Sequence, residues 1–162
     1  MGYITGYPNG SFNPKGAITK AEFISILSRA LKLQAYSPGA PEFNNVSPGD
    51  WFYGSVESTV HADVTNGEEN DYFYPDKPIT REEMATIFVN ALGKKGEDRA
   101  SISAQTVFTD DTSISFWATG FVVVAVKYGL LKGYPDNGFM PQNDATRAKA
   151  CAMINNYLSI IK

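Results

Sequence analysis

Apolar residues recur at one helical spacing in three separate parts of the chain. In each part they occupy positions i, i+4, i+7 and i+8, which places them along one side of an amphipathic helix. Each run follows a threonine, a residue type that often caps the start of a helix. We therefore predict three short helices, capped by Thr19, Thr80 and Thr146. Their apolar stripes are Phe23, Leu27, Ala30 and Leu31; Met84, Phe88, Ala91 and Leu92; and Ala150, Ile154, Tyr157 and Leu158.

The first two helices carry a stronger start signal than the third. Glu22 and Glu83 lie three residues after their threonines, where a glutamate side chain can return a hydrogen bond to the capping residue. The third helix has Lys149 at this position. We expect its cap to be weaker by about 0.5–1 kcal/mol.

A turn precedes each of these helices in the same register. Residues 6–10 read Gly-Tyr-Pro-Asn-Gly and residues 133–138 read Gly-Tyr-Pro-Asp-Asn-Gly, which are typical turn sequences. In the middle of the chain, residues 68–71 read Glu-Glu-Asn-Asp instead. We therefore expect the middle loop to have a different shape.

A second helix is predicted ahead of the last two turns. Trp51 and Trp117 stand at matching positions near its start, and we expect it to be the longer helix of each unit. The later example is apolar nearly all round over residues 121–128. Such a helix is expected at the centre of a bundle.

The pattern divides the chain into three repeats. Residues 1–35 form the back half of the first repeat, residues 43–93 the second and residues 107–162 the third. A repeat of this kind is one supersecondary unit that buries its apolar face against its neighbours. By register, the tryptophan of the first repeat would lie ahead of Met1. We therefore expect that the chain is a trimmed piece or that a partner chain supplies the front half of this repeat. We therefore expect Phe23 and Leu27 to be covered by a rearranged neighbour or by self-association.

Composition excludes several classes of protein. The 162 residues carry a net charge of −3 with scattered Lys and Arg, which argues against a nucleic-acid binder. No apolar run is long enough to span a membrane. A single Cys excludes an internal disulfide, and a single His cannot form a histidine-based metal site. With one Cys and one His there is little choice for a nucleophile–histidine pair, and none is visible. We predict that the domain is not an enzyme and needs neither metal nor cofactor.

A basic residue follows each capping threonine. Lys20, Arg81 and Arg147 occupy the first helical position, where the helix dipole disfavours a cation by roughly 0.3–1 kcal/mol. A bound anion would offset this cost, because a helix N-terminus and a guanidinium can converge on a carboxylate. An alternative is that each cation pairs with a carboxylate of another repeat, with candidates Asp50, Asp71 and Asp110.

The tryptophans and the threonines can each have a structural role or a ligand-binding role. Trp51 and Trp117 can anchor a core or present a flat face to a sugar ring. Thr80 and Thr146 are helix caps first and possible ligand contacts second.

The three-fold recurrence resembles the S-layer homology family of wall-anchoring modules. The resemblance rests on the tryptophan at the helix start, the Gly-Tyr-Pro turn and the Ile-Thr-basic helix start, and it covers almost the whole chain. It implies an all-α fold in which three units form a pseudo-threefold arrangement around a central helical bundle. It also implies a surface protein outside the cell, anchored without covalent bonds to the wall.

The resemblance further implies grooves between repeats that bind the secondary cell-wall polymer, a pyruvylated glycan. The residues it indicates as ligand-binding are Arg81, Arg147, Lys20, Trp51, Trp117, Thr80 and Thr146. Because Lys20, Lys149 and the middle turn depart from the family pattern, we expect the sites to be unequal. The alternative function is a structural module for self-assembly or protein contacts, with the arginines in ion pairs between repeats.

Overall fold

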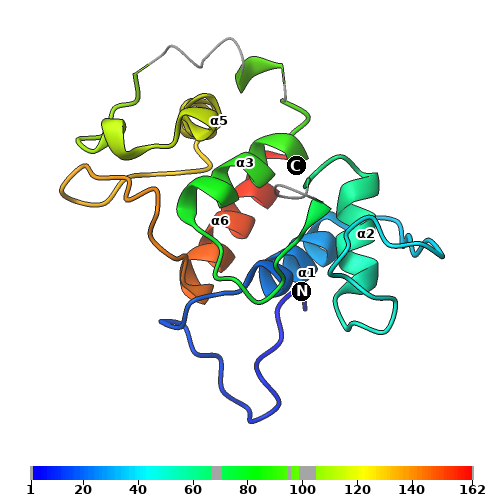
Figure 1. Cartoon of the computed structure of the whole chain (residues 1–162). Coiled ribbons are helices and arrows are strands. Elements are labelled where there is room, and N and C mark those ends of the chain that lie inside the picture. The colour runs from blue at the N-terminus through cyan, green and yellow to red at the C-terminus, as the bar shows by residue number, and fades with distance from the viewer. Residues whose placement is uncertain (1, 67–70, 95, 99–104, 162) are drawn as a thin grey trace. The chain divides into compact units, whose positions relative to one another are not determined.

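The computed structural model describes residues 2–66, 71–94, 96–98 and 105–161 (Figure 1). Within these ranges the regular elements are helical, so the predicted all-α class is confirmed. Among these helices none is both long and apolar enough to cross a membrane. Apart from Asp71, the middle loop at residues 68–71 lies outside the described residues. The main helices are α1 (Lys20–Leu31), α2 (Tyr53–His61), α3 (Arg81–Ala91), α5 (Phe116–Lys127) and α6 (Arg147–Ile160), with a short 3-10 helix η2 (Asp111–Ser113).

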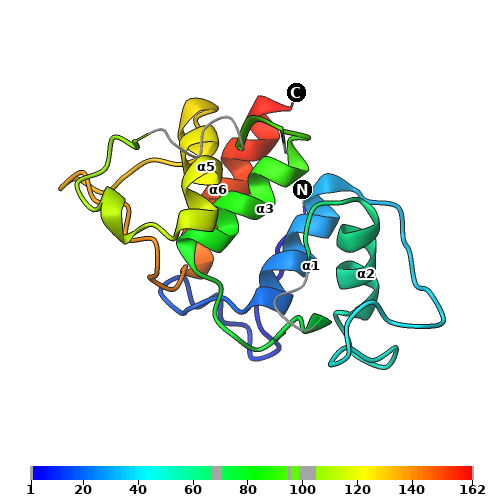
Figure 2. The ribbon, with the colours of Figure 1, turned by 45° about the horizontal axis from the view of Figure 1, so that its top comes forward.

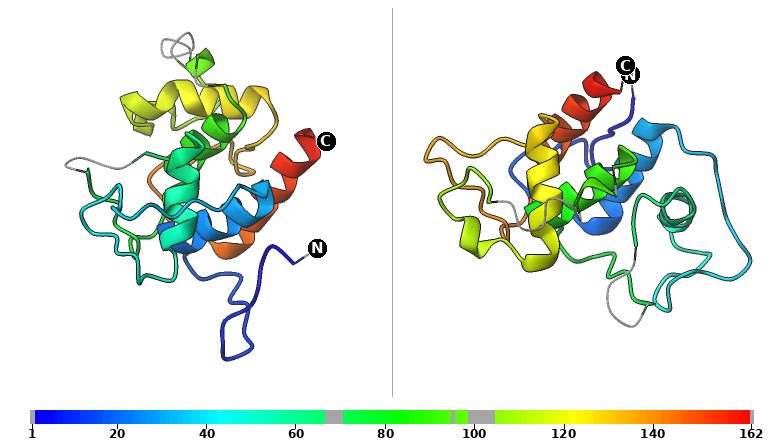
Figure 3. Two further views of the ribbon diagram at one scale, coloured as in Figure 1. Left: turned by 90° about the vertical axis from the view of Figure 1, so that its right-hand side faces the viewer. Right: turned by 90° about the horizontal axis from the view of Figure 1, so that it is seen from above.

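The chain forms two compact units. Residues 1–79 and 146–154 make the first, and residues 80–145 and 155–162 make the second. In the first unit α1 packs against α2, and in the second α3 packs against α5 (Figures 2 and 3). These units do not follow the three predicted repeats, whose boundaries and pseudo-threefold arrangement remain predictions.

The predicted helix caps are present. The Thr19 hydroxyl accepts a hydrogen bond from the Glu22 N–H at 3.2 Å, and the Glu22 carboxylate accepts one from the Thr19 N–H. Thr80 and Glu83 form the same reciprocal pair. The Thr146 hydroxyl accepts from the Lys149 N–H at 3.3 Å, without a carboxylate to return the bond.

The apolar stripe of α1 is covered by the chain's own residues. Phe23 and Leu27 are fully buried. α1 therefore has no exposed apolar stripe, and the reason for expecting self-association there is removed.

Two expectations about the second helix of each repeat are wrong. α2 has 9 residues against 11 in α3, and α5 has 12 against 14 in α6, so it is the shorter helix in both cases. The segment 121–128 is also not enclosed on all sides, because Phe121 and Tyr128 are only half-buried and Lys127 is exposed. Ahead of it, Phe116 is 77% exposed and Trp117 is 51% exposed. The buried residues of α5 include Val122 and Val124.

Replacing Gly120 by alanine should destabilise the second unit by about 1–3 kcal/mol. Gly120 lies within α5, and an added Cβ would overlap the carbonyl oxygen of Asp98. Because that obstacle is backbone, the chain around Asp98 would have to move. Chemical denaturation of the variant measures the loss.

Gly54→Ala is the matched control. Gly54 lies within α2, and its nearest neighbour would be the Ser37 hydroxyl at 3.4 Å. Alanine there should be neutral or stabilising by about 0.5–1 kcal/mol, because glycine is a poor helix former. Equal effects of the two substitutions would contradict the close approach of Asp98.

Candidate functional site

The helix starts that carry the basic residues are bonded to loops of other repeats. In α1, α3 and α6 the first two backbone N–H groups, which a helix cannot satisfy internally, each donate to one loop carbonyl. The first helix bonds a loop of the second repeat, the second helix a loop of the third, and the third helix a loop of the first. The bonds are Lys20 to Lys77 and Ala21 to Pro75, Arg81 to Asn143 and Glu82 to Pro141, and Arg147 to Gly16 and Ala148 to Pro14, at 2.9–3.2 Å. The N–H groups expected to converge on an anion are therefore already used.

Arg147 lies buried in the first unit, with 4% of its surface exposed. Its Nε donates to the Phe12 carbonyl at 3.1 Å and its Nη2 to the Thr5 carbonyl at 2.9 Å. Its Nη1 lies 3.8 Å from a carboxylate oxygen of Glu22. The guanidinium also stacks over the Tyr7 ring, 4.5 Å from its centroid. Arg147 thus fixes the first turn of the chain to α6.

Arg81 makes matching contacts in the second unit. Its Nε donates to the Phe139 carbonyl at 2.7 Å and its Nη2 to the Lys132 carbonyl at 3.3 Å. The guanidinium lies over the Tyr134 ring at 4.7 Å. Burial lowers the pKa of Arg81, while Tyr134 and Asp110 act in the opposite direction. The side chain is therefore held in a dry environment by carbonyls and rings.

Asp110 holds the loop that Arg81 contacts. Its two carboxylate oxygens accept hydrogen bonds from the backbone N–H groups of Phe139 and Met140, both at 2.7 Å. Burial raises the pKa of Asp110, but these N–H groups and the nearby Arg81 outweigh it, so the pKa is lowered. The carboxylate is thus stabilised in its charged form.

Lys20 is also buried, with 6% of its surface exposed, and its ammonium lies 5.8 Å from the centroid of the Phe73 ring. All three predicted cations therefore lie over an aromatic ring of another repeat. The alternative, in which each cation pairs with a carboxylate of another repeat, is supported in part. Arg147 forms an ion pair with Glu22, and the charge of Asp110 acts on Arg81.

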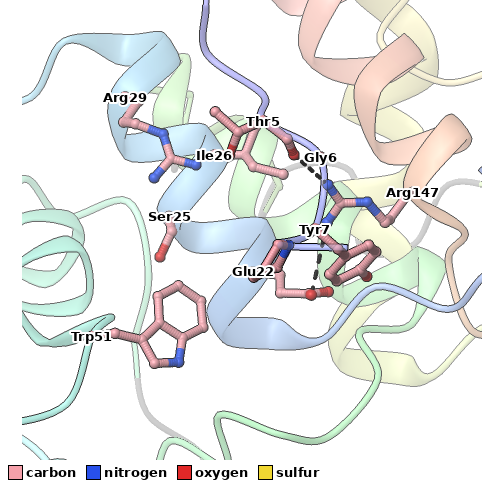
Figure 4. Close-up of a pocket in the computed structure, with 10 residues that line it drawn as sticks. Thr5, Gly6, Tyr7, Glu22, Ser25, Ile26, Arg29, Trp51 and Arg147 are labelled. Carbon is pink, nitrogen blue, oxygen red and sulfur yellow. Dashed lines mark hydrogen bonds and ion pairs between the residues drawn. The ribbon is translucent and has the colours of Figure 1, made fainter. Parts of the chain in front are cut away.

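One pocket brings predicted site residues together. It has a volume of about 250 Å³ and lies within the first unit (Figure 4). Arg147 and Trp51 both line it, although they come from different repeats. Its lining residues are Thr5, Gly6, Tyr7, Pro8, Glu22, Ser25, Ile26, Arg29, Trp51 and Arg147. Lys20, Arg81, Trp117, Thr80 and Thr146 are not among them.

Trp51 is held at the edge of this pocket by the turn before α2. The Asp50 carboxylate accepts from the Ser47 N–H at 2.7 Å, and the Asp50 carbonyl accepts from the Tyr53 N–H at 3.0 Å. The buried Phe52 ring meets the indole edge-on, with centroids 5.3 Å apart. The indole itself is 69% exposed, so the interpretation of Trp51 as a core anchor is wrong. The exposed Trp117 contradicts that interpretation as well.

Sequence reasoning missed the part of the pocket that α1 provides. Ser25, Arg29 and Glu22 line it from successive turns of this helix (Figure 4). A serine within a run of apolar helical residues was the available signal, since Ser25 follows Phe23 and Ile24 and precedes Ile26. Figure 4 shows Glu22 beside Arg147, with the ion pair and the bond to Thr5 drawn as dashed lines.

Metal-ligating side chains do not gather around this pocket or elsewhere in the part of the chain that the structure describes. The groups that line the pocket include the exposed Trp51 indole, the guanidinium groups of Arg29 and Arg147, the Ser25 hydroxyl and the Glu22 carboxylate.

The chain matches the model of the S-layer homology domain over residues 1–24, 42–85 and 107–151. It is 31% identical to a cellulosome-anchoring protein of Acetivibrio thermocellus, over 96% of this chain and 35% of that protein. It is 35% identical to a surface-layer 125 kDa protein of Lysinibacillus sphaericus, over 85% of this chain and 11% of that protein.

An amylopullulanase of Thermoanaerobacterium thermosulfurigenes is 34% identical over 96% of this chain, but the match covers only 8% of the enzyme. The chain thus spans about a third or less of each of these three relatives. The similarity is confined to a small part of the amylopullulanase and is no evidence that this chain has its activity.

Proposed function

The chain belongs to the S-layer homology domain family, and we propose that it anchors a bacterial surface protein by binding a pyruvylated wall polysaccharide in the pocket around Trp51. The domain is an anchoring module of the cell surface, associated with the cell wall. The finer points, which are the identity of the glycan and its binding site, are our proposal.

The observation that carries the proposal is that the exposed Trp51 lines one pocket together with two arginines, Arg29 and Arg147. An indole face suits the apolar face of a sugar ring, and a guanidinium suits a carboxylate such as that of a pyruvate ketal. The volume of about 250 Å³ is below the range of roughly 300–1,000 Å³ that encloses drug-sized ligands. The pocket therefore suits one terminal sugar better than a longer stretch of polymer.

Removal of the Trp51 indole should weaken wall binding about twofold to tenfold, since a good aromatic contact contributes about 0.5–1.5 kcal/mol. The measurement is co-sedimentation of Trp51→Ala with wall sacculi that carry the pyruvylated polymer. Phe116→Ala is the matched control, because Phe116 is 77% exposed and does not line the pocket. Sacculi stripped of pyruvate should retain much less of the wild-type protein. Equal retention of Trp51→Ala and wild type would contradict the proposal.

A structural module is the second candidate, and the contacts of Arg81 favour it. Arg81 is bonded to two carbonyls and stacked over Tyr134. These contacts hold α3 to the loop of the third repeat that contains Phe139 and Lys132. This role predicts that Arg81→Ala lowers stability while the remaining folded protein still binds the wall. Lys20, Arg81, Trp117, Thr80 and Thr146 remain predicted ligand contacts of further sites.

A further inference from the structure

We infer that Arg29 and Ser25 hold the anionic group of the ligand, while Arg147 serves mainly to hold the wall of the pocket. This inference rests on the proposed function, because it assigns the residues that act in the same pocket. It assigns different roles to Arg29 and Arg147, which line the same pocket but have different surroundings.

Arg147 has little capacity left for a ligand. Its three guanidinium nitrogens are directed to Phe12, Thr5 and Glu22. Its charge faces the carboxylate of Glu22, so the pair contributes little net charge to the pocket. Its contacts hold the first turn, and residues 5–8 of that turn form one side of the pocket.

The contacts of Arg81 support a structural role for Arg147. Both arginines donate from Nε and Nη2 to carbonyls of a loop in another repeat. Both stack over the tyrosine of a Gly-Tyr-Pro turn, which is Tyr134 for Arg81 and Tyr7 for Arg147. A contact set that recurs in both units is explained by the fold without a ligand.

Arg29 differs from Arg147 in each of these respects. It is exposed on α1, and its Nε donates to the Tyr3 carbonyl at 3.1 Å. Arg29 is one of the residues that line the pocket, and Figure 4 shows its guanidinium near Ser25 and Ile26. The matching positions of the other two helices are Asn90 and Asn156, which carry no charge. A cation at this position is therefore particular to the first repeat.

Ser25 provides an independent observation. Its side chain is 1% exposed and lines the pocket, and its hydroxyl has no hydrogen-bond partner among the described residues. A buried hydroxyl without a partner is unfavourable, so an oxygen of a bound ligand is a suitable partner. The matching Thr86 of α3 is already bonded to the Glu82 carbonyl at 3.1 Å, and Ala152 of α6 has no hydroxyl.

Glu22 limits the affinity for an anion in this arrangement. Its carboxylate lines the same pocket and would repel the carboxylate of a ligand. Its side chain also caps α1, but glutamine can form the same capping bond. Glu22→Gln therefore removes the repelling charge and preserves the helix start.

The test is calorimetric titration with pyruvylated N-acetylmannosamine and with its unpyruvylated counterpart. Arg29→Gln should weaken binding of the pyruvylated sugar about tenfold or more and leave the unpyruvylated sugar nearly unaffected. Ser25→Ala should weaken binding about threefold to tenfold. Glu22→Gln should strengthen binding of the pyruvylated sugar about threefold to tenfold.

The controls are Lys15→Gln and Glu83→Gln. Lys15 is an exposed cation outside the pocket, so its loss changes the net charge as Arg29→Gln does. Glu83 caps α3 as Glu22 caps α1. Both variants should bind as wild type does. Hydrogen exchange of residues 5–12 should stay unchanged in Arg29→Gln and rise in Arg147→Lys.

The outcomes separate the inference from the proposed function. A wild-type protein that does not prefer the pyruvylated sugar overturns both. A wild-type protein that prefers it, with Arg29→Gln equal to wild type or no worse than Lys15→Gln, overturns only the assignment of Arg29 and Ser25. Weaker binding by Glu22→Gln would also count against that assignment.

Discussion

Arg81→Ala should lower the free energy of unfolding by about 3–5 kcal/mol, as expected when a buried charged hydrogen-bonding group is removed. Arg81 is 5% exposed and bonds the carbonyls of Phe139 and Lys132. Alanine leaves these carbonyls without their donor and removes the stacking on Tyr134. Urea unfolding at neutral pH measures the change.

Arg29→Ala provides the reference for this experiment. Arg29 is an exposed arginine on α1 with one bond to a carbonyl, so its loss should change stability by about 0.5 kcal/mol or less. If Arg81→Ala lowers the free energy of unfolding no more than Arg29→Ala does, then water must replace the guanidinium as the hydrogen-bond donor to the two carbonyls. The guanidinium of Arg81 would then not be what fixes the loop to α3.

Glu82→Ala should destabilise the second unit by about 2–3 kcal/mol, because a buried charged acceptor loses several hydrogen bonds. Glu82 is 2% exposed. Its carboxylate accepts from the Ser115 N–H at 3.0 Å, from the Ser115 hydroxyl at 2.7 Å and from the Gln142 amide at 2.8 Å. Ser115 is the residue at the start of α5, so these bonds hold the start of α5 to Glu82 on α3.

Glu83→Ala is the neighbouring control, since it removes only the reciprocal cap of α3 and should cost about 0.5–1 kcal/mol. A double-mutant cycle of Glu82→Ala with Gln142→Ala measures the coupling between the two side chains. Equal losses for Glu82→Ala and Glu83→Ala would show that the contact between α3 and α5 does not depend on this carboxylate.

Local signals predicted the helix starts correctly. Thr19 with Glu22, and Thr80 with Glu83, are close in sequence, and their capping bonds depend on spacing within one turn. The apolar stripe of α1 could be predicted for the same reason. These features are decided by residues a few positions apart.

The surroundings of Arg81 and Arg147 could not be predicted in this way. Their partners are carbonyls of loops that lie 51 to 142 residues away, and a carbonyl carries no residue-type signal. The helix dipole makes a cation at this position unfavourable, so another group must offset its charge. A bound anion and a backbone carbonyl can both do so, and the sequence does not distinguish them.

Two of the residues that line the pocket were candidates from the sequence, and their role in binding stays a prediction. Trp51 and Arg147 were candidate residues, and the structure brings both to one space. Arg29 and Ser25 were missed because a polar residue on an amphipathic helix is ordinarily a solvated position. Arg29 and Ser25 line a pocket only because the turn at residues 5–8 lies near α1 in the folded chain.

The bond between Arg147 and Thr5 joins residues 142 positions apart, so the arginine that holds one side of the pocket is synthesised long after that side. The ribosome must extend the chain through the start of α6 before the first turn can be fixed. Contacts of such long range close late, after the local helices have formed. A nascent chain released before α6 would have the indole and the α1 side chains but no fixed opposite wall.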